Sequence, residues 1–177
     1  MTQRIRLTPN ICYMLGVYSC SYKRDQALIE MESEREEFLD RFIKIAIGEL
    51  AVAPNRLLVR REDRRRLYIA GFYHSKLKRF MDNSMERRDR IFKYRNEHTA
   101  NYFAGLFDRA GGCDSNGMYL YKIGNENIIL MERFGLHTSN AIRTRVRNES
   151  AFIMLISKYS LRMQSIVHQP GNERDLR

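Results

Sequence analysis

The nine residues YFAGLFDRA at positions 102–110 align without a gap with YMLGVYSCS at positions 13–21. Both stretches are mostly apolar, as in a buried helix, and each carries a glycine at its fourth position, Gly16 or Gly105. The two copies begin 89 positions apart. A short pattern that recurs at such a distance favours two related units within one chain. The sequence therefore predicts two tandem repeats, each opening with an apolar helix.

The segments after the first apolar helix predict a mixed unit of helices and strands. Thr8 before Pro9 is a suitable cap for that helix. Apolar and polar residues then alternate over 26–32, as in a strand with one solvent-facing side. The other elements expected here are a helix over 34–48, strands over 56–61 and 66–73 joined by the turn 62–65, and a basic amphipathic helix over 75–94 with a break near residues 83–84.

A similar order follows the second apolar helix, for which Thr99 is the expected cap. The expected elements are a strand over 118–123, a helix over 127–134 closed by Gly135, and a strand pair over 140–147 and 151–159. The pattern leaves open whether this half lacks a last helix or forms it from residues 160–167. The prediction is an α+β protein with a first repeat over 1–96, a second repeat over 97–168 and a flexible polar tail over 169–177.

The composition is that of a globular protein. The 177 residues are 44% hydrophobic and 29% charged, and apolar runs such as 151–157 are much shorter than a membrane-spanning helix requires. No charged segment leads into an apolar stretch near the start, so no secretory signal is expected. Three cysteines without a C-x-x-C pair indicate neither a disulfide framework nor a zinc site. We expect a cytoplasmic, nucleoid-associated protein that does not contact membranes.

The charge balance favours an anionic partner. Lys and Arg number 31 against 21 Asp and Glu, which gives a net charge of +10. Of the 31 cations 24 are Arg, whose planar guanidinium group binds phosphates and guanine edges in bidentate fashion. Composition by itself is also compatible with a basic protein that never contacts a nucleic acid.

The second motif, together with its extension Gly111-Gly112, resembles the signature helix of the LAGLIDADG homing endonucleases. The sequence LMERFGL at 130–136 is similar to the helix end that commonly follows it in that family. The resemblance covers about residues 8–160 and implies a monomer with internal pseudo-twofold symmetry. In such a molecule the two motif helices pack together at Gly16 and Gly105, and two antiparallel sheets form a saddle over double-stranded DNA.

The resemblance also implies an acidic residue at the foot of each motif helix, where a pair of carboxylates binds divalent metal ions. The corresponding residues here are Ser21 and Ala110, which offer no carboxylate. We therefore expect no metal and no cofactor. Mg²⁺ would be needed only if cleavage persists through other carboxylates, for which Asp25, Asp108 and Asp114 are the candidates.

Basic residues in both halves are the predicted DNA contacts. Arg143, Arg145 and Arg147 alternate with apolar or small residues, which places the three guanidinium groups on one face of a strand. The corresponding stretch of the first half is also rich in arginine, and Lys122 lies in the strand predicted over 118–123. Solvated sheet edges would look similar, although two basic hairpins at equivalent places favour a groove-binding surface. The remaining predicted contacts are Arg56, Arg60, Arg61, Arg64, Arg65 and Arg66.

Three functions follow from these patterns. The first is a double-stranded DNA-binding protein with a homing-endonuclease fold that has lost cleavage and serves as a regulator or accessory factor. An alternative is a Mg²⁺-dependent endonuclease that uses non-standard carboxylates. A second alternative is a binder of structured RNA, such as an intron splicing helper, which needs no carboxylates either.

Overall fold

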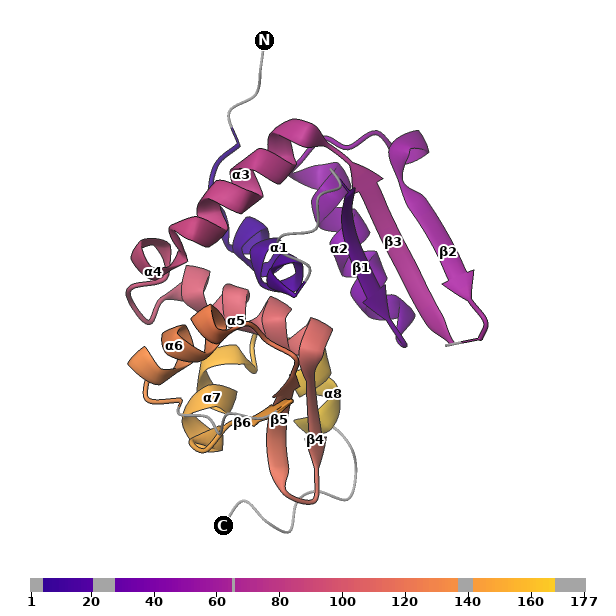
Figure 1. Cartoon of the computed structure of the whole chain (residues 1–177). Coiled ribbons are helices and arrows are strands. Elements are labelled where there is room, and N and C mark those ends of the chain that lie inside the picture. The colour runs from indigo at the N-terminus through magenta and orange to yellow at the C-terminus, as the bar shows by residue number, and fades with distance from the viewer. Residues whose placement is uncertain (1–4, 21–27, 65, 137–141, 168–177) are drawn as a thin grey trace.

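The computed structural model describes residues 5–20, 28–64, 66–136 and 142–167. Within them the chain forms eight α-helices and two separate antiparallel sheets of three strands each (Figure 1). The predicted α+β class is confirmed. No helix in these ranges is both long and apolar enough to span a membrane.

Two helices, one from each half, lie side by side at the centre of the molecule (Figure 1). The first is α1 (Pro9–Ser19), which begins after Thr8, and the Thr8 hydroxyl accepts a hydrogen bond from the Ile11 N–H at 3.2 Å. The second is α5 (Glu97–Ala110), in which Asn96 is the cap. The prediction that Thr99 caps this helix is wrong, because Thr99 is buried in the first turn and donates its hydroxyl to the Tyr94 carbonyl.

The two helices touch through their backbones at the motif glycines. A Cβ atom on Gly16 would lie 2.0 Å from the Tyr102 carbonyl oxygen, and one on Gly105 would lie 2.1 Å from the Tyr13 carbonyl oxygen. Distances this short leave no room for any side chain, so only glycine fits at either position. Gly16 and Gly105 therefore lie where α1 and α5 approach each other most closely.

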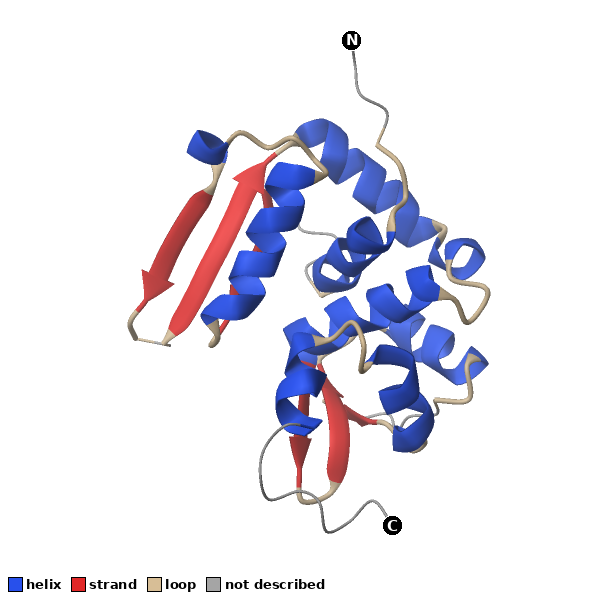
Figure 2. Ribbon diagram, turned by 180° about the vertical axis from the view of Figure 1, so that it is seen from behind, coloured by secondary structure: helices blue, strands red, loops and turns tan. Residues whose placement is uncertain are grey.

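The first sheet has the order β1-β3-β2, formed by β1 (Leu28–Ser33), β3 (Leu67–Tyr73) and β2 (Leu58–Glu62). A short 3₁₀ turn, η1 (Pro54–Arg56), leads into β2. Helix α2 (Glu36–Gly48) packs across one face of this sheet, with the Phe42 and Phe72 ring centroids 5.8 Å apart (Figure 2). Ile29, Met31 and Phe72 are buried on this face and point toward α2. The residues that alternate with them along β1 and β3 point to the opposite face of the sheet.

The second sheet has the order β4-β5-β6, formed by β4 (Gly111–Asp114), β5 (Gly117–Tyr121) and β6 (Arg143–Arg145). Its buried face carries Met118, Leu120 and Thr144. Strand β4 was not predicted, since its two glycines lack the side chains that make a strand recognisable in a sequence. Strand β6 is shorter than the predicted 140–147, and residues 140 and 141 lie outside the described ranges.

The expected strand over 151–159 is wrong, because this segment is helical. Helix α7 (Glu149–Ile156) begins after Asn148, whose side chain accepts a hydrogen bond from the Ala151 N–H. Its buried residues Phe152 and Ile156 are four positions apart, which is the spacing of one helix face. A short apolar run without alternation fits a strand or a buried helix equally well, and here a polar cap and tertiary packing favour the helix. A further helix, α8 (Leu161–Val167), ends the described chain.

The remaining helices agree broadly with the sequence pattern. They are α3 (Ser75–Glu86), α4 (Arg88–Ile91) and α6 (Asn125–Arg133). The basic helix predicted over 75–94 does break, but at Arg87 rather than near residues 83–84. Gly135 follows α6 with a φ of 66°, a conformation that suits glycine, which confirms the predicted helix end. The proposed boundary between residues 96 and 97 falls at the start of α5, and the predicted tail lies outside the described residues.

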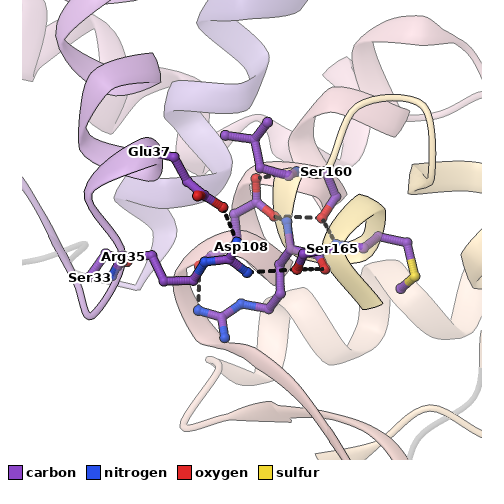
Figure 3. A network of polar contacts seen from close by, with 9 residues as sticks. Ser33, Arg35, Glu37, Asp108, Ser160 and Ser165 are labelled. Atoms are coloured by element: carbon purple, nitrogen blue, oxygen red, sulfur yellow. Dashed lines mark hydrogen bonds and ion pairs between the residues drawn. The ribbon is translucent and has the colours of Figure 1, made fainter. Parts of the chain in front are cut away.

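Helix α8 is fixed to α5 through the buried carboxylate of Asp108 (Figure 3). One Asp108 oxygen accepts from the Ser160 hydroxyl and from the Arg162 N–H at 3.1 Å. The other oxygen accepts from the Tyr13 hydroxyl at 2.9 Å and from the Leu161 N–H at 3.1 Å. Burial raises the pKa of Asp108, and the four donors oppose that shift. This side chain therefore joins α1, α5 and the start of α8.

Replacing either motif glycine by alanine should destabilise the protein strongly. We expect Gly16→Ala and Gly105→Ala each to lower the free energy of unfolding by about 3 kcal/mol, since the added methyl group meets backbone atoms that cannot move aside. Gly48→Ala is the matched control: a Cβ at Gly48, in the last turn of α2, meets nothing within 4 Å and should change stability by less than about 1 kcal/mol. Urea unfolding measures all three, and similar losses in the three variants would contradict the close contact.

Asp108→Asn should also destabilise the protein, by about 1–3 kcal/mol, because an amide offers one acceptor oxygen where the carboxylate serves four donors with two. The exposed Asp40 of α2 provides a control, since Asp40→Asn should stay within about 0.5 kcal/mol of the wild type. Chemical denaturation at neutral pH compares the variants. Unchanged stability of Asp108→Asn would exclude the carboxylate as the anchor of α8.

Candidate functional site

A cleft of about 1010 Å³ lies at the C-terminal ends of α1 and α5. Cys20 and Ala110 mark these ends, and both halves of the chain contribute to the walls. Of the two positions where the resemblance implies an acid, Ala110 lines this cleft and Ser21 lies outside the described residues. The wall residues used below are Glu32, Glu34, Arg35, Arg109, Asp114, Tyr119, Tyr121, Lys122, Arg143 and Arg162.

An ion pair joins the two halves beside Ala110. Arg109 of α5 donates one Nη to the Glu32 backbone carbonyl at 3.0 Å and the other to the Glu32 carboxylate at 3.1 Å. Both side chains are mostly covered, with about 20% and 25% of their surfaces exposed. The charged contact at the foot of the second motif helix is therefore a cation bound to a carboxylate of the opposite half.

The alternative carboxylates differ in their surroundings. Asp108 is buried and occupied by four donors, as described above, so its oxygens serve the fold. Asp25 lies outside the described residues. No group of three or more His, Cys, Asp or Glu side chains in the described ranges is arranged to hold a metal ion.

Asp114, at the end of β4, is held by two of the arginines predicted to bind DNA. The two Nη atoms of Arg145 lie 2.6 and 2.8 Å from the two carboxylate oxygens of Asp114, and one Nη of Arg143 lies 3.3 Å from one of these oxygens. The hydrogen bonds from Arg145, followed by one from the Asn116 N–H, lower the pKa of Asp114 to about 2. This carboxylate therefore neutralises part of the basic strand in the unbound protein.

The open face of the second sheet is basic and aromatic. The strand register pairs Tyr119 with Arg145 and Tyr121 with Arg143, so these four side chains share a face. The guanidinium carbons of Arg143 and Arg145 lie 5.0 and 5.3 Å from the centroid of the Tyr119 ring. Lys122 follows with its Nζ 5.2 Å from the Tyr121 ring centroid.

The alternation predicted around β6 agrees with the burial of its residues. Thr144 and Val146 are buried, Arg143 and Arg147 are exposed, and Arg145 is half-buried. Ile142 departs from the pattern because 68% of it is exposed. The arginines thus occur at the predicted place, but only Arg143 and Arg145 lie in β6, and the segment after them is a helix instead of the second strand of a hairpin.

The arginines of the first half are dispersed instead of aligned. Arg60 and Arg61 are neighbours in β2, so they point to opposite faces, and Arg61 lies on the α2 side. There the guanidinium carbon of Arg61 lies 5.6 Å from the Tyr68 ring centroid, and its Nε lies 3.2 Å from a carboxylate oxygen of Asp63. Arg64 and Arg66 lie in the turn between β2 and β3, Arg56 ends η1, and Arg65 is outside the described residues.

Sequence reasoning missed two parts of this surface. Tyr119 and Tyr121 alternate within a predicted strand, and this period-two pattern could have placed them with the basic residues. Arg35 and Arg162 also reach the cleft, but they come from the start of α2 and from α8. No local pattern connects residues so far apart in the chain.

The Asp114 bridge should be visible in a pH titration. Because the pKa of this carboxyl is lowered in the folded protein from its ordinary value of 3.8, the stability it contributes is present above pH 4 and is lost as the pH falls toward 2. We expect a carboxyl titration midpoint near 2 by NMR, which returns toward 3.8 in Arg145→Gln. An ordinary midpoint in the wild type would exclude the bridge in solution.

Comparison with known proteins identifies the fold. No family model matches the sequence, and no curated protein matches it. Among solved structures, the chain resembles I-DmoI in complex with DNA and Ca, with a TM-score of 0.63 and 14% identity over 91% of this chain and 98% of that one.

Two further I-DmoI structures give the same result. The complex with DNA and Mn has a TM-score of 0.61 and 14% identity, covering 85% of this chain and 97% of that one. A structure of mesophilic variants of the homing endonuclease I-DmoI has a TM-score of 0.62 and 13% identity, covering 86% and 97%. At such identity the likeness concerns the fold alone, so this chain has the two-domain α+β fold of the LAGLIDADG homing endonuclease I-DmoI.

Proposed function

We propose that this protein binds double-stranded DNA through the open face of its second sheet and does not cleave it. The observation that carries the proposal is the pair Arg143 and Arg145 opposite Tyr121 and Tyr119, with the exposed Arg147 following and the cleft alongside. Exposed guanidinium groups on a strand suit contacts to phosphates and base edges in a groove. The I-DmoI structures with DNA support the proposal, because they carry the same fold.

The side chains near the C-terminal end of α5 support the proposed loss of cleavage. The side chain of Ala110 has no oxygen, so it cannot supply the carboxylate that hard divalent cations bind. Asp108 is buried with four donors, and both oxygens of Asp114 are bound by Arg145. A protein that retains the DNA surface without these ligands would act as a regulator or accessory factor.

The net charge of +10 adds a sequence-independent attraction to the specific contacts. Each phosphate neutralised by a lysine or arginine releases counterions, so affinity should fall steeply with salt. Before it meets DNA, Arg145 is bound by Asp114, and phosphates would have to replace that carboxylate. Binding therefore exchanges one anionic partner of Arg145 for another.

The test of this function is selection from a pool of random DNA duplexes, with and without Mg²⁺, followed by a search for cuts in the enriched pool. We expect an enriched sequence and no cuts. Cleavage that depends on Mg²⁺ would favour the endonuclease alternative, with Asp25 or Asp114 as ligands. Equal or better competition by structured RNA would favour the RNA-binding alternative, and no enrichment would contradict nucleic-acid recognition.

The triple variant Arg143→Gln, Arg145→Gln, Arg147→Gln should weaken DNA binding and lower the salt dependence of the binding constant. We expect the slope of log K against log salt to fall by up to about 2.7, or about 0.9 for each lost phosphate contact. The matched control removes three exposed cations of α3 and α4, by Lys76→Gln, Arg79→Gln and Arg90→Gln. An equal fall in this control would indicate that only net charge matters.

A further inference from the structure

Two guanidinium groups from different halves of the chain line the cleft and lie over the same buried ring, that of Phe38. The guanidinium carbon of Arg35 lies 5.3 Å from the Phe38 ring centroid, and that of Arg162 lies 5.2 Å from it. Arg35 precedes α2 in the first half, whereas Arg162 belongs to α8. Both residues line the cleft at the helix feet.

Arg162 has an unused donor. Its Nη2 donates to the Asp108 backbone carbonyl at 3.1 Å, but its Nε is buried and has no hydrogen-bond partner. Among the described residues, this Nε is the one buried side-chain nitrogen or oxygen in that condition. A buried donor without a partner costs free energy, so an acceptor that reaches it gains a hydrogen bond to a charged group.

Among the described residues, Arg35 has a carboxylate partner but the Arg162 guanidinium group has none. Arg35 donates to the Ser165 hydroxyl at 2.6 Å and pairs with Glu37. Asp108 gives the Arg162 guanidinium group only its backbone carbonyl, because its carboxylate is filled by two hydroxyl groups and two backbone N–H groups, one of them that of Arg162. Burial lowers the pKa of Arg162, with Arg35 adding to the decrease and Asp108 and Glu34 opposing it. The arrangement is that of two neighbouring cations held where an anion would relieve their repulsion.

The cleft as a whole carries more positive than negative side chains. Its cations are Arg35, Arg109, Lys122, Arg143 and Arg162, and its carboxylates are Glu32, Glu34 and Asp114. Glu32 is already bound by Arg109, and Asp114 by Arg145. The volume of about 1010 Å³ is large enough for a nucleotide segment.

We propose that Arg35 and Arg162 form a phosphate-binding site that holds one backbone phosphate of the bound DNA at the foot of the motif helices without a metal ion. Arginine suits this role because its planar donors match two phosphate oxygens. The inference rests on the proposed DNA binding and adds the position and the residues of one central contact. It places a cationic site where the I-DmoI fold would otherwise be expected to bring carboxylates together.

The test measures DNA affinity as a function of salt, in EDTA and again in Mg²⁺, for Arg35→Gln and Arg162→Gln. Each variant should bind about tenfold more weakly and lose up to about 0.9 from the salt slope, equally in both buffers. Arg162→Lys, which keeps the charge but not the Nε donor, should recover the slope. Arg41→Gln is the structural control, because Arg41 also joins α2 to the C-terminal segment through the Tyr159 carbonyl but does not line the cleft.

The outcomes separate this site from the proposed function. If the wild type binds duplex DNA and the Arg143, Arg145 and Arg147 triple variant lowers the salt slope, but Arg35→Gln and Arg162→Gln do not, the phosphate site is excluded and DNA binding stands. A similar slope change in Arg41→Gln would also overturn the site, since it would reflect a disturbed α2–α8 contact. A loss of DNA affinity in Arg35→Gln or Arg162→Gln that appears only in Mg²⁺ and not in EDTA would contradict a metal-free contact.

A second measurement distinguishes DNA phosphate from free phosphate. Thermal unfolding is compared in inorganic phosphate and in chloride at equal ionic strength, for the wild type and Arg162→Gln. Stabilisation by phosphate that requires Arg162, in a protein that binds no duplex, would overturn DNA as the source of the anion. If Arg162→Gln does not fold, Arg35→Gln carries the same comparison.

Discussion

The backbone contact between α1 and α5 at Gly16 and Gly105 sets the geometry of the whole molecule. Because no side chain separates the helices there, their C-terminal ends lie close together and open onto one shared cleft. Strand β4 continues directly from α5, so the helix also fixes the second sheet. Any residue larger than glycine would push the two halves apart and displace the walls of the cleft with them.

Charged residues near the C-terminal end of α5 hold the two halves together. Asp108 anchors α8, and Arg109 binds Glu32 of the first half. Consecutive residues of a helix point in different directions, which allows each to serve a different neighbour. Both contacts stabilise the fold, and the lining of the cleft carries more cations than carboxylates.

The two sheets differ in how they present positive charge. On β6, period-two alternation places Arg143 and Arg145 on one open face beside two tyrosines. On β2, the adjacent Arg60 and Arg61 must point to opposite faces, which divides the charge between the open side and the α2 side. In the proposed DNA complex, the second half would therefore supply the denser set of contacts, while the first half would contribute mainly through its turn.

The sequence by itself determined the features that depend on neighbouring residues: the two motif helices, the cap at Thr8, the strands of the first sheet and the alternation around β6. Only the tertiary structure decided that residues 149–156 form a helix, since their apolar run suits either conformation until it packs. It also decided which charges meet. Asp114 and Arg145 are 31 residues apart and Arg109 and Glu32 are 77 apart, and such pairs form only when the fold brings their strands and helices together.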